Sequence, residues 1–294
     1  MNLNPKNAVF FAGTILAVVL AGRATTRAEI FIAGSILPSD FTYIGPTQTK
    51  WNPGPNSASV FTHVAPLGPM SPGSATWSIM GPGLGDVSGF DPHGGALTTS
   101  FSALTTSDET AIFAAALAVW DTASGFISLG MVADGGSGFG APESAGGHLG
   151  DIRIGAVSGF GGGVLAHSYQ PGTQALFGLG GTIAGDIHIN SAFTWTDDPA
   201  GSGFDLFTVM LHELGHSLGL GHSAVSGSVM EPFYSGRRRT LHADDIAGIQ
   251  AIYGPPSAMA AVPEPASLTL LGIGAIGMVG YGWRRRKQTQ SACP

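Results

Sequence analysis

Alternation of apolar and polar side chains predicts strands at residues 75–80, 126–132 and 151–157, because successive strand residues point to opposite faces of a sheet. Residues 110–123 instead carry apolar side chains at helical spacing, behind a Ser-Asp-Glu capping signal. A final helix is expected over residues 243–253. The positions of the first helix expected to face the core are Ile112, Ala115, Ala116, Val119 and Trp120.

Composition divides the rest of the chain. Residues 29–73 are expected to be irregular, since Pro, Gly, Ser and Thr are scattered through them, and to form either a short pro-region or an N-terminal wrap. A folded domain is expected over residues 74–254. Its glycine-rich stretch 134–150 is expected to be a loop, with a calcium site through Asp134 as the alternative. Prolines mark residues 255–265 as a linker.

Both ends of the chain carry apolar segments. Residues 1–28 combine a lysine, an apolar stretch and a small-residue cleavage site, which is typical of a secretory signal peptide, with a buried N-terminal helix as the alternative. Residues 266–283 are uncharged and just long enough to span a bilayer as a transmembrane segment. The basic tail 284–294 would then stay in the cytoplasm. Either segment places the domain between them outside the cytoplasm.

Charge is distributed unevenly along the chain. Seven of its twelve Lys and Arg residues lie in these terminal segments, so five remain in the middle against all nineteen acidic residues, a net charge of about −14. This balance argues against nucleic acid as a partner. The single cysteine, Cys293, lies in the tail, so the domain has no disulfide. The basic run 237–239 is expected to be a solvated turn rather than a substrate contact or a processing site.

The motif His-Glu-x-x-His-x-x-Gly-x-x-His, which begins at His212, carries the most specific chemistry. Residues four apart share one face of a helix, so His212 and His216 can direct two imidazoles at one metal ion. Gly219 permits a left-handed turn that brings round His222 as the third ligand. Three ligands leave a fourth position open to water, the mark of a catalytic zinc site, and Glu213 can act as base on that water. The motif therefore predicts one catalytic Zn²⁺ rather than chance histidines.

This extended motif resembles that of the metzincin metalloproteases, and its surroundings resemble their matrixin branch. Residues 228–234 are similar to the family's Met-turn, with Met230 beneath the zinc, and to the wall of its main specificity pocket, with Pro232 and Tyr234. Residues 241–254 are similar to its closing helix. The resemblance implies an α+β, zincin-like fold with a mixed, twisted five-stranded sheet, an active-site helix and two further helices.

Two strands of the family pattern are also similar. Residues 164–172 resemble the edge strand, on which Leu165 and Ala166 would hold an extended substrate by main-chain hydrogen bonds. His167 in this strand and His188 in the last one occupy positions of two ligands to the family's structural zinc. The His-x-Asp pair that completes that site is missing, so the two histidines either share a second, structural Zn²⁺ or make ordinary hydrogen bonds. A structural Ca²⁺, which the resemblance implies near residues 190–193, lacks most of its acidic ligands there.

The Val-Pro-Glu-Pro stretch that begins at Val262 precedes the terminal apolar segment and basic cluster. Together these resemble the PEP-CTERM sorting signal of Gram-negative bacteria; a plain C-terminal membrane anchor is the alternative. The resemblance implies export machinery and an exosortase-type enzyme as partners. It also implies an extracellular or cell-surface location, with transient or lasting anchoring in the inner membrane.

The predicted function is a secreted or surface-sorted zinc-dependent endopeptidase that hydrolyses peptide bonds of extracellular proteins. Its partners would be protein or peptide substrates. Because the domain has no cysteine, it lacks the cysteine-based latency peptide of matrix metalloproteases. The alternative function is a non-catalytic surface or biofilm-matrix protein that retains a metalloprotease fold.

Overall fold

A computed structural model describes residues 29–32, 49–51, 64–66, 71–87, 95–141, 150–160, 163–172 and 183–256. The predicted signal peptide 1–28, most of the linker, the apolar segment 266–283 and the tail 284–294 lie outside these residues. Within the described part of the chain, none of the helices has the length and apolar character needed to cross a membrane.

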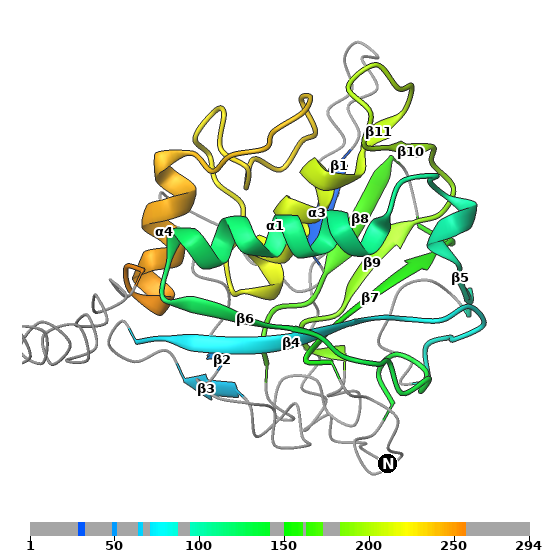
Figure 1. Ribbon diagram of the computed structural model, residues 1–294, viewed down its shortest axis with the longest axis horizontal. Coiled ribbons are helices and arrows are strands. Elements are labelled where there is room, and N and C mark those ends of the chain that lie inside the picture. The colour runs from blue at the N-terminus through cyan, green and yellow to red at the C-terminus, as the bar shows by residue number, and fades with distance from the viewer. Residues whose placement is uncertain are drawn as a thin grey trace, which may run out of the picture. The chain divides into compact units, whose positions relative to one another are not determined.

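A mixed sheet forms the centre of the domain (Figure 1). In hydrogen-bonding order its strands are β1 (Glu29–Ile32), β8 (Val164–Ser168), β9 (Ile187–Asn190), β7 (Ile152–Val157), β4 (Gly73–Ile79) and β6 (Phe126–Met131). Neighbours run parallel except β8 and β9. The short β5 (Thr98–Thr99) pairs antiparallel with β7. The mixed five-stranded sheet is therefore confirmed in β8, β9, β7, β4 and β6, which β1 and β5 extend.

Residues 29–73 are not irregular throughout, contrary to the sequence expectation, because they contain three short strands. β1 adds to the sheet, and β2 (Thr49–Trp51) pairs antiparallel with β3 (Val64–Pro66). The outer edge of β8 would otherwise present unpaired peptide groups, and β1 satisfies them. β8 is therefore not an edge strand in this structure, contrary to the sequence expectation.

Among the described residues, three α-helices accompany the sheet, as predicted: α1 (Glu109–Ala123), α3 (Leu206–Ser217) and α4 (Ala243–Tyr253) (Figure 1). A second small sheet pairs β10 (Trp195–Thr196) with β11 (Phe204–Asp205) just before α3. α1 packs between α3 and β6. Its indole at Trp120 donates a 2.9 Å hydrogen bond from Nε1 to the carbonyl of Leu211, which ties α1 to the helix that carries the histidines.

The N-terminal cap of α1 is the predicted one, since the carboxylate of Asp108 accepts from the amide of Ala111 at 3.1 Å. The buried face differs from the expected one. Phe113 and Leu117 are buried, whereas Ala115 is exposed. Burying the two large side chains removes more apolar surface from water than burying an alanine, so the helix presents that face to the core.

The predicted calcium alternative at Asp134 is wrong. Both carboxylate oxygens accept hydrogen bonds from the guanidinium of Arg153, at 2.8 and 2.9 Å. The two side chains are only 7% and 0% exposed. A carboxylate occupied by a buried guanidinium has neither free oxygens nor the electrostatic surroundings that a divalent cation requires.

Candidate metal centre and active site

The helix α3 is held rigidly because all twelve of its residues are buried. Its first turn is capped by Asp205, whose carboxylate accepts from the amide of Thr208 at 3.0 Å. Two hydroxyl groups hold it from the sides: Ser168 on β8 donates to the carbonyl of Glu213 at 3.0 Å, and Ser217 donates to the carbonyl of Gly185 at 2.9 Å. The side chains that α3 carries are therefore fixed relative to the sheet.

Three imidazoles meet at one point, as the motif predicts. His212 and His216 lie on successive turns of α3, with their Nε2 atoms 2.9 Å apart. The chain leaves the helix through Gly219, whose φ of 107° is one that side chains resist, and this turn brings His222 beside the other two rings. One ligand atom from each of the three lies within 4.8 Å of the others.

Main-chain carbonyls orient two of these rings. Nδ1 of His212 is 2.7 Å from the carbonyl of Val229, and Nδ1 of His216 is 2.8 Å from that of Leu220. A carbonyl only accepts, so each Nδ1 carries the proton and each Nε2 presents its lone pair to the centre. Burial, reinforced by His222, lowers the pKa of His212 to about 3, and burial likewise lowers the pKa of His216 well below 6.5. Both rings are therefore neutral at pH 7, the form that binds metal.

Glu213 provides the test of whether a metal fits here. Its side chain is fully buried, and among the described residues neither carboxylate oxygen has a hydrogen-bond partner. Burial raises its pKa well above 4.5. Such an arrangement is costly unless the carboxylate has a partner that is not part of the protein chain. Three imidazoles beside it are the donor set of a zinc ion with one open position, so the residues fit zinc.

A close glycine contact places Met230 under the histidines. A Cβ atom at Gly215, which directly precedes His216, would overlap the sulfur of Met230 and crowd the ring of Trp120. Gly215, at a variable position of the motif, thus allows the thioether to pack against the helix between the first two ligands. Met230 is 2% exposed and packs beside Gly215, and its role as the floor of a metal site stays a prediction.

Asp245, in the first turn of α4, is a structural residue of the site that sequence reasoning missed. Its buried carboxylate accepts from the amides of Val229 at 2.8 Å and Met230 at 3.1 Å, and from the hydroxyl of Ser228. It also closes a capping box with His242. The acidic first turn signals a helix start, but that signal alone does not show that the carboxylate organises the Met-turn.

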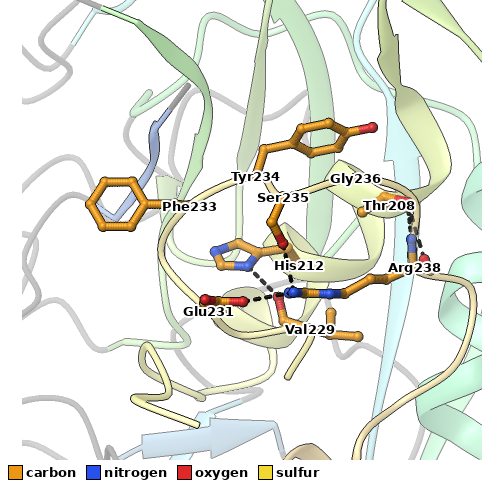
Figure 2. A pocket seen from close by; sticks show the side chains of 9 residues that line it. All are labelled: Thr208, His212, Val229, Glu231, Phe233, Tyr234, Ser235, Gly236 and Arg238. Carbon is orange, nitrogen blue, oxygen red and sulfur yellow. Dashed lines mark hydrogen bonds and ion pairs between the residues drawn. The ribbon is translucent and has the colours of Figure 1, made fainter. Parts of the chain in front are cut away.

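A hollow beside His212 is lined by the segment that follows Met230 (Figure 2). The hydroxyl of Tyr234 accepts from the amide of Asp205 at 3.2 Å, which fixes this wall against the start of α3. Pro232, predicted to form the wall with Tyr234, is not among the lining residues. The lining comprises Thr208, His212, Val229, Glu231, Phe233, Tyr234, Ser235, Gly236 and Arg238.

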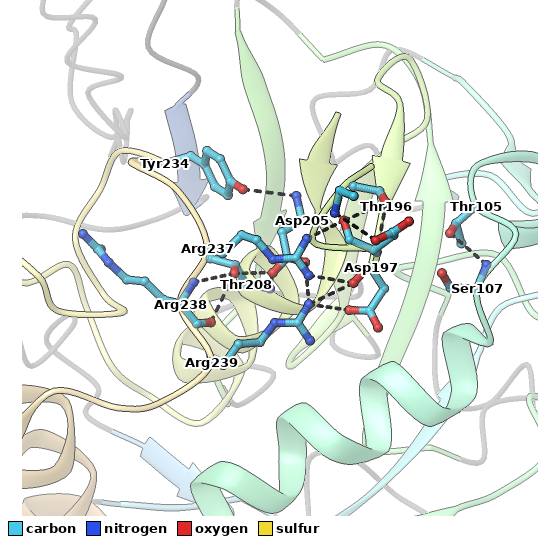
Figure 3. A network of polar contacts seen from close by, with 12 residues as sticks. Thr105, Ser107, Thr196, Asp197, Asp205, Thr208, Tyr234, Arg237, Arg238 and Arg239 are labelled. Atoms are coloured by element: carbon cyan, nitrogen blue, oxygen red, sulfur yellow. Dashed lines mark hydrogen bonds and ion pairs between the residues drawn. The ribbon is translucent and has the colours of Figure 1, made fainter. Parts of the chain in front are cut away.

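The basic run 237–239 is not the expected solvated turn. Arg237 and Arg239 both form ion pairs with Asp205, at 2.9 and 2.7 Å, and Arg239 also pairs with Asp197 at 2.6 Å (Figure 3). Arg238 extends in the other direction, into the hollow (Figures 2 and 3). The guanidinium groups of Arg237 and Arg239 therefore bind the start of α3, whereas that of Arg238 lines the hollow.

His167 and His188 lie opposite each other on β8 and β9, as the sequence suggests. Nε2 of His167 is 3.0 Å from Nδ1 of His188, and the ring of Phe139 packs edge-on against His188 at 4.6 Å. Within the described ranges, the three histidines of the catalytic motif are the one group with metal-ligand spacing. The two strand histidines thus make a hydrogen bond, and a second metal there stays a prediction.

Leu165 and Ala166 are fully buried in the middle of β8, which pairs with β9 on one side and β1 on the other. β1 runs parallel to β8, with Glu29 opposite Val164 and Phe31 opposite His167. The main-chain groups predicted to bind substrate therefore face a segment of the same chain.

Comparison with known proteins gives two family matches. Residues 96–254 match the model of the family described as Matrixin, and residues 261–287 match the PEP-CTERM protein-sorting motif. Neutrophil collagenase of Homo sapiens is 40% identical over 144 residues, which cover 44% of this chain and 29% of the collagenase. Karilysin of Tannerella forsythia is 42% identical over 94 residues, and stromelysin-1 of Rattus norvegicus 47% over 98, each match covering 32% of this chain and 18% of the relative. The matched part spans less than a third of the length of each relative.

Proposed function

The chain belongs to the matrixin family, and from this premise we propose that residues 74–254 form a zinc-dependent endopeptidase domain that hydrolyses peptide bonds of extracellular proteins. The observation that carries the proposal is the meeting of three histidines beside the buried carboxylate of Glu213, for which no described residue supplies a hydrogen-bond partner. The match to the PEP-CTERM motif supports an exported, surface-sorted protein that an exosortase-type enzyme processes.

His212, His216 and His222 would hold the zinc. When bound there, zinc supplies a Lewis acid that polarises the scissile carbonyl and makes water a nucleophile near pH 7. Glu213 accepts the proton of the attacking water and then passes it to the departing amine. Its raised pKa suits this work, since a carboxylate with a higher pKa is the stronger base and its acid form can still give the proton back.

An extended peptide would bind by adding to β8, with Leu165 and Ala166 supplying main-chain hydrogen bonds. Strand addition discriminates little between sequences, so selectivity falls to the hollow beside His212. The side chain that follows the scissile bond would enter this hollow along Tyr234. The names collagenase and stromelysin-1 describe those relatives only. The substrate preference of this chain is inferred from the residues that line its own hollow.

Digestion of casein by the purified chain tests the proposal. We expect cleavage that a zinc chelator abolishes and added Zn²⁺ restores. Intact casein after incubation with the zinc-loaded chain would instead support the non-catalytic surface protein. Counting the bound zinc in the same preparation is informative as well, since one ion per chain leaves none for His167 and His188.

Disrupting β1 is expected to speed cleavage, because β1 occupies the side of β8 to which substrate would add. An intramolecular competitor lowers the fraction of chains that can bind, so its loss should reduce KM about tenfold while kcat stays unchanged. Deletion of residues 29–32 and the single change Phe31→Pro, which removes a main-chain donor, should act alike. The check is a steady-state assay with a peptide substrate; an unchanged KM in both variants would mean that β1 does not compete.

A further inference from the structure

Two charged side chains, Arg238 and Glu231, line the hollow beside His212. Arg238 donates from its main-chain amide to the hydroxyl of Thr208 at 2.8 Å, which fixes its backbone against α3. Its side chain then extends along the hollow between Glu231 and Ser235 (Figure 2). Asp205 is already paired with Arg237 and Arg239, so Glu231 is the carboxylate that balances Arg238.

The guanidinium of Arg238 still has hydrogen-bonding capacity. Its Nη2 donates to Glu231 and to Ser235, both at 2.7 Å, and its Nη1 donates to the carbonyl of Ser228. A guanidinium has five N–H groups, so the Nε–H and one Nη1–H have no acceptor among the described residues. The side chain is 20% exposed, and its free donors can be reached by a group that enters the hollow.

These donors decide which substrate side chain is stable there. An apolar side chain would displace water from the two N–H groups without replacing its hydrogen bonds, which costs free energy. A side chain that ends in an oxygen acceptor satisfies them. A carboxylate on the substrate side chain would lie close to the carboxylate of Glu231, and the two negative charges would repel each other.

We propose that Arg238 determines the specificity of this hollow, and that the side chain it selects is uncharged and ends in a hydrogen-bond acceptor, as glutamine does. The proposal rests on the proposed function, which brings a peptide to the hollow. Arg238 would contact the substrate side chain and would not take part in cleavage of the peptide bond.

Three peptides that differ only in the residue after the scissile bond, glutamine, leucine or glutamate, test the proposal. The wild-type chain should cleave the glutamine peptide with kcat/KM about tenfold above that of the leucine peptide, as expected for one hydrogen bond to a charged group. Arg238→Met should bring this ratio to about one. Glu231→Gln should raise kcat/KM for the glutamate peptide about tenfold relative to glutamine, because it leaves Arg238 unbalanced.

Arg239→Met is the matched control, because its guanidinium faces Asp197 and Asp205 instead of the hollow. It should keep the wild-type ratio. Each ratio compares two peptides cleaved by the same protein preparation. It therefore does not change if part of the Arg238→Met protein is unfolded. An equal or greater rate for leucine in the wild-type chain, or an unchanged ratio in Arg238→Met, would overturn the proposal.

Peptide binding separates this proposal from the proposed function. The Kd values of the same peptides for the zinc-loaded Glu213→Gln chain should show the same order and the same dependence on Arg238, measured without turnover. Absence of cleavage together with a tenfold tighter glutamine peptide would refute the proposed activity and support the specificity. Cleavage together with equal Kd values for the glutamine and leucine peptides would support the proposed activity and refute the proposed specificity.

Discussion

Glu213→Gln is expected to lower kcat for peptide cleavage by roughly 10³-fold, the usual contribution of a general base, while zinc remains at one ion per chain. The amide keeps the size of the carboxylate but cannot take a proton from water. It is also not one of the three ligands, so metal binding should persist. The two measurements are a rate assay with a saturating peptide and a zinc determination on the same sample.

Glu109→Gln, at the start of α1, is the control for the loss of one negative charge and should keep the wild-type rate. If the Glu213→Gln chain retained more than about a tenth of wild-type kcat, Glu213 would not be the base. Loss of zinc along with activity would point instead to a structural role for the carboxylate beside the ligands.

Acidification is expected to release zinc and unfold the domain together below about pH 5. Burial, helped by His222, sets the pKa of His212 near 3 in the folded, metal-free chain, against 6.5 for an ordinary histidine. Below pH 6.5 the unfolded chain therefore binds a proton at His212 that the folded chain does not bind. The stability that the neutral ring contributes is complete above pH 6.5 and is lost as the pH falls towards 3, by about 1.4 kcal/mol per pH unit for each such histidine.

Zinc content and the midpoint of thermal unfolding, followed from pH 7 to pH 4 with and without added zinc, check this expectation. Both should fall over the same interval, and return to pH 7 with Zn²⁺ should restore activity. Full zinc retention by a folded chain at about pH 4 would argue against three-histidine binding.

The sequence predicts the histidine cluster well because the residues that form it are close together in the chain. The four-residue spacing of His212 and His216 is set by the helix, and Gly219 alone supplies the turn to His222. The cap at Asp108 is likewise encoded within one turn of α1. Such features depend on neighbours in the chain, so they can be predicted before the fold is known.

Other features depend on partners far away in the sequence. The sequence places Arg238 in a basic run, but its pairing with Glu231 and its direction opposite to Arg237 and Arg239 depend on how the segment after the Met-turn packs on α3. The pairing of β1 with β8 joins Glu29 to Val164, which are far apart in the sequence. Neither periodicity nor composition carries information of this kind.

Asp245 also sets the order in which the site can mature. In an exported chain the amino-terminal end crosses the membrane first, so all three histidines emerge before α4, which carries the carboxylate that holds the Met-turn. The floor of the centre can form only after α4 has followed. Proteolytic capacity would then arise only outside the cytoplasm, after nearly the whole domain has been translocated, and the producing cell would be spared. A sorting cut near the Pro-Glu-Pro motif would lie beyond Tyr253, the last residue of α4, and would leave this helix with the domain.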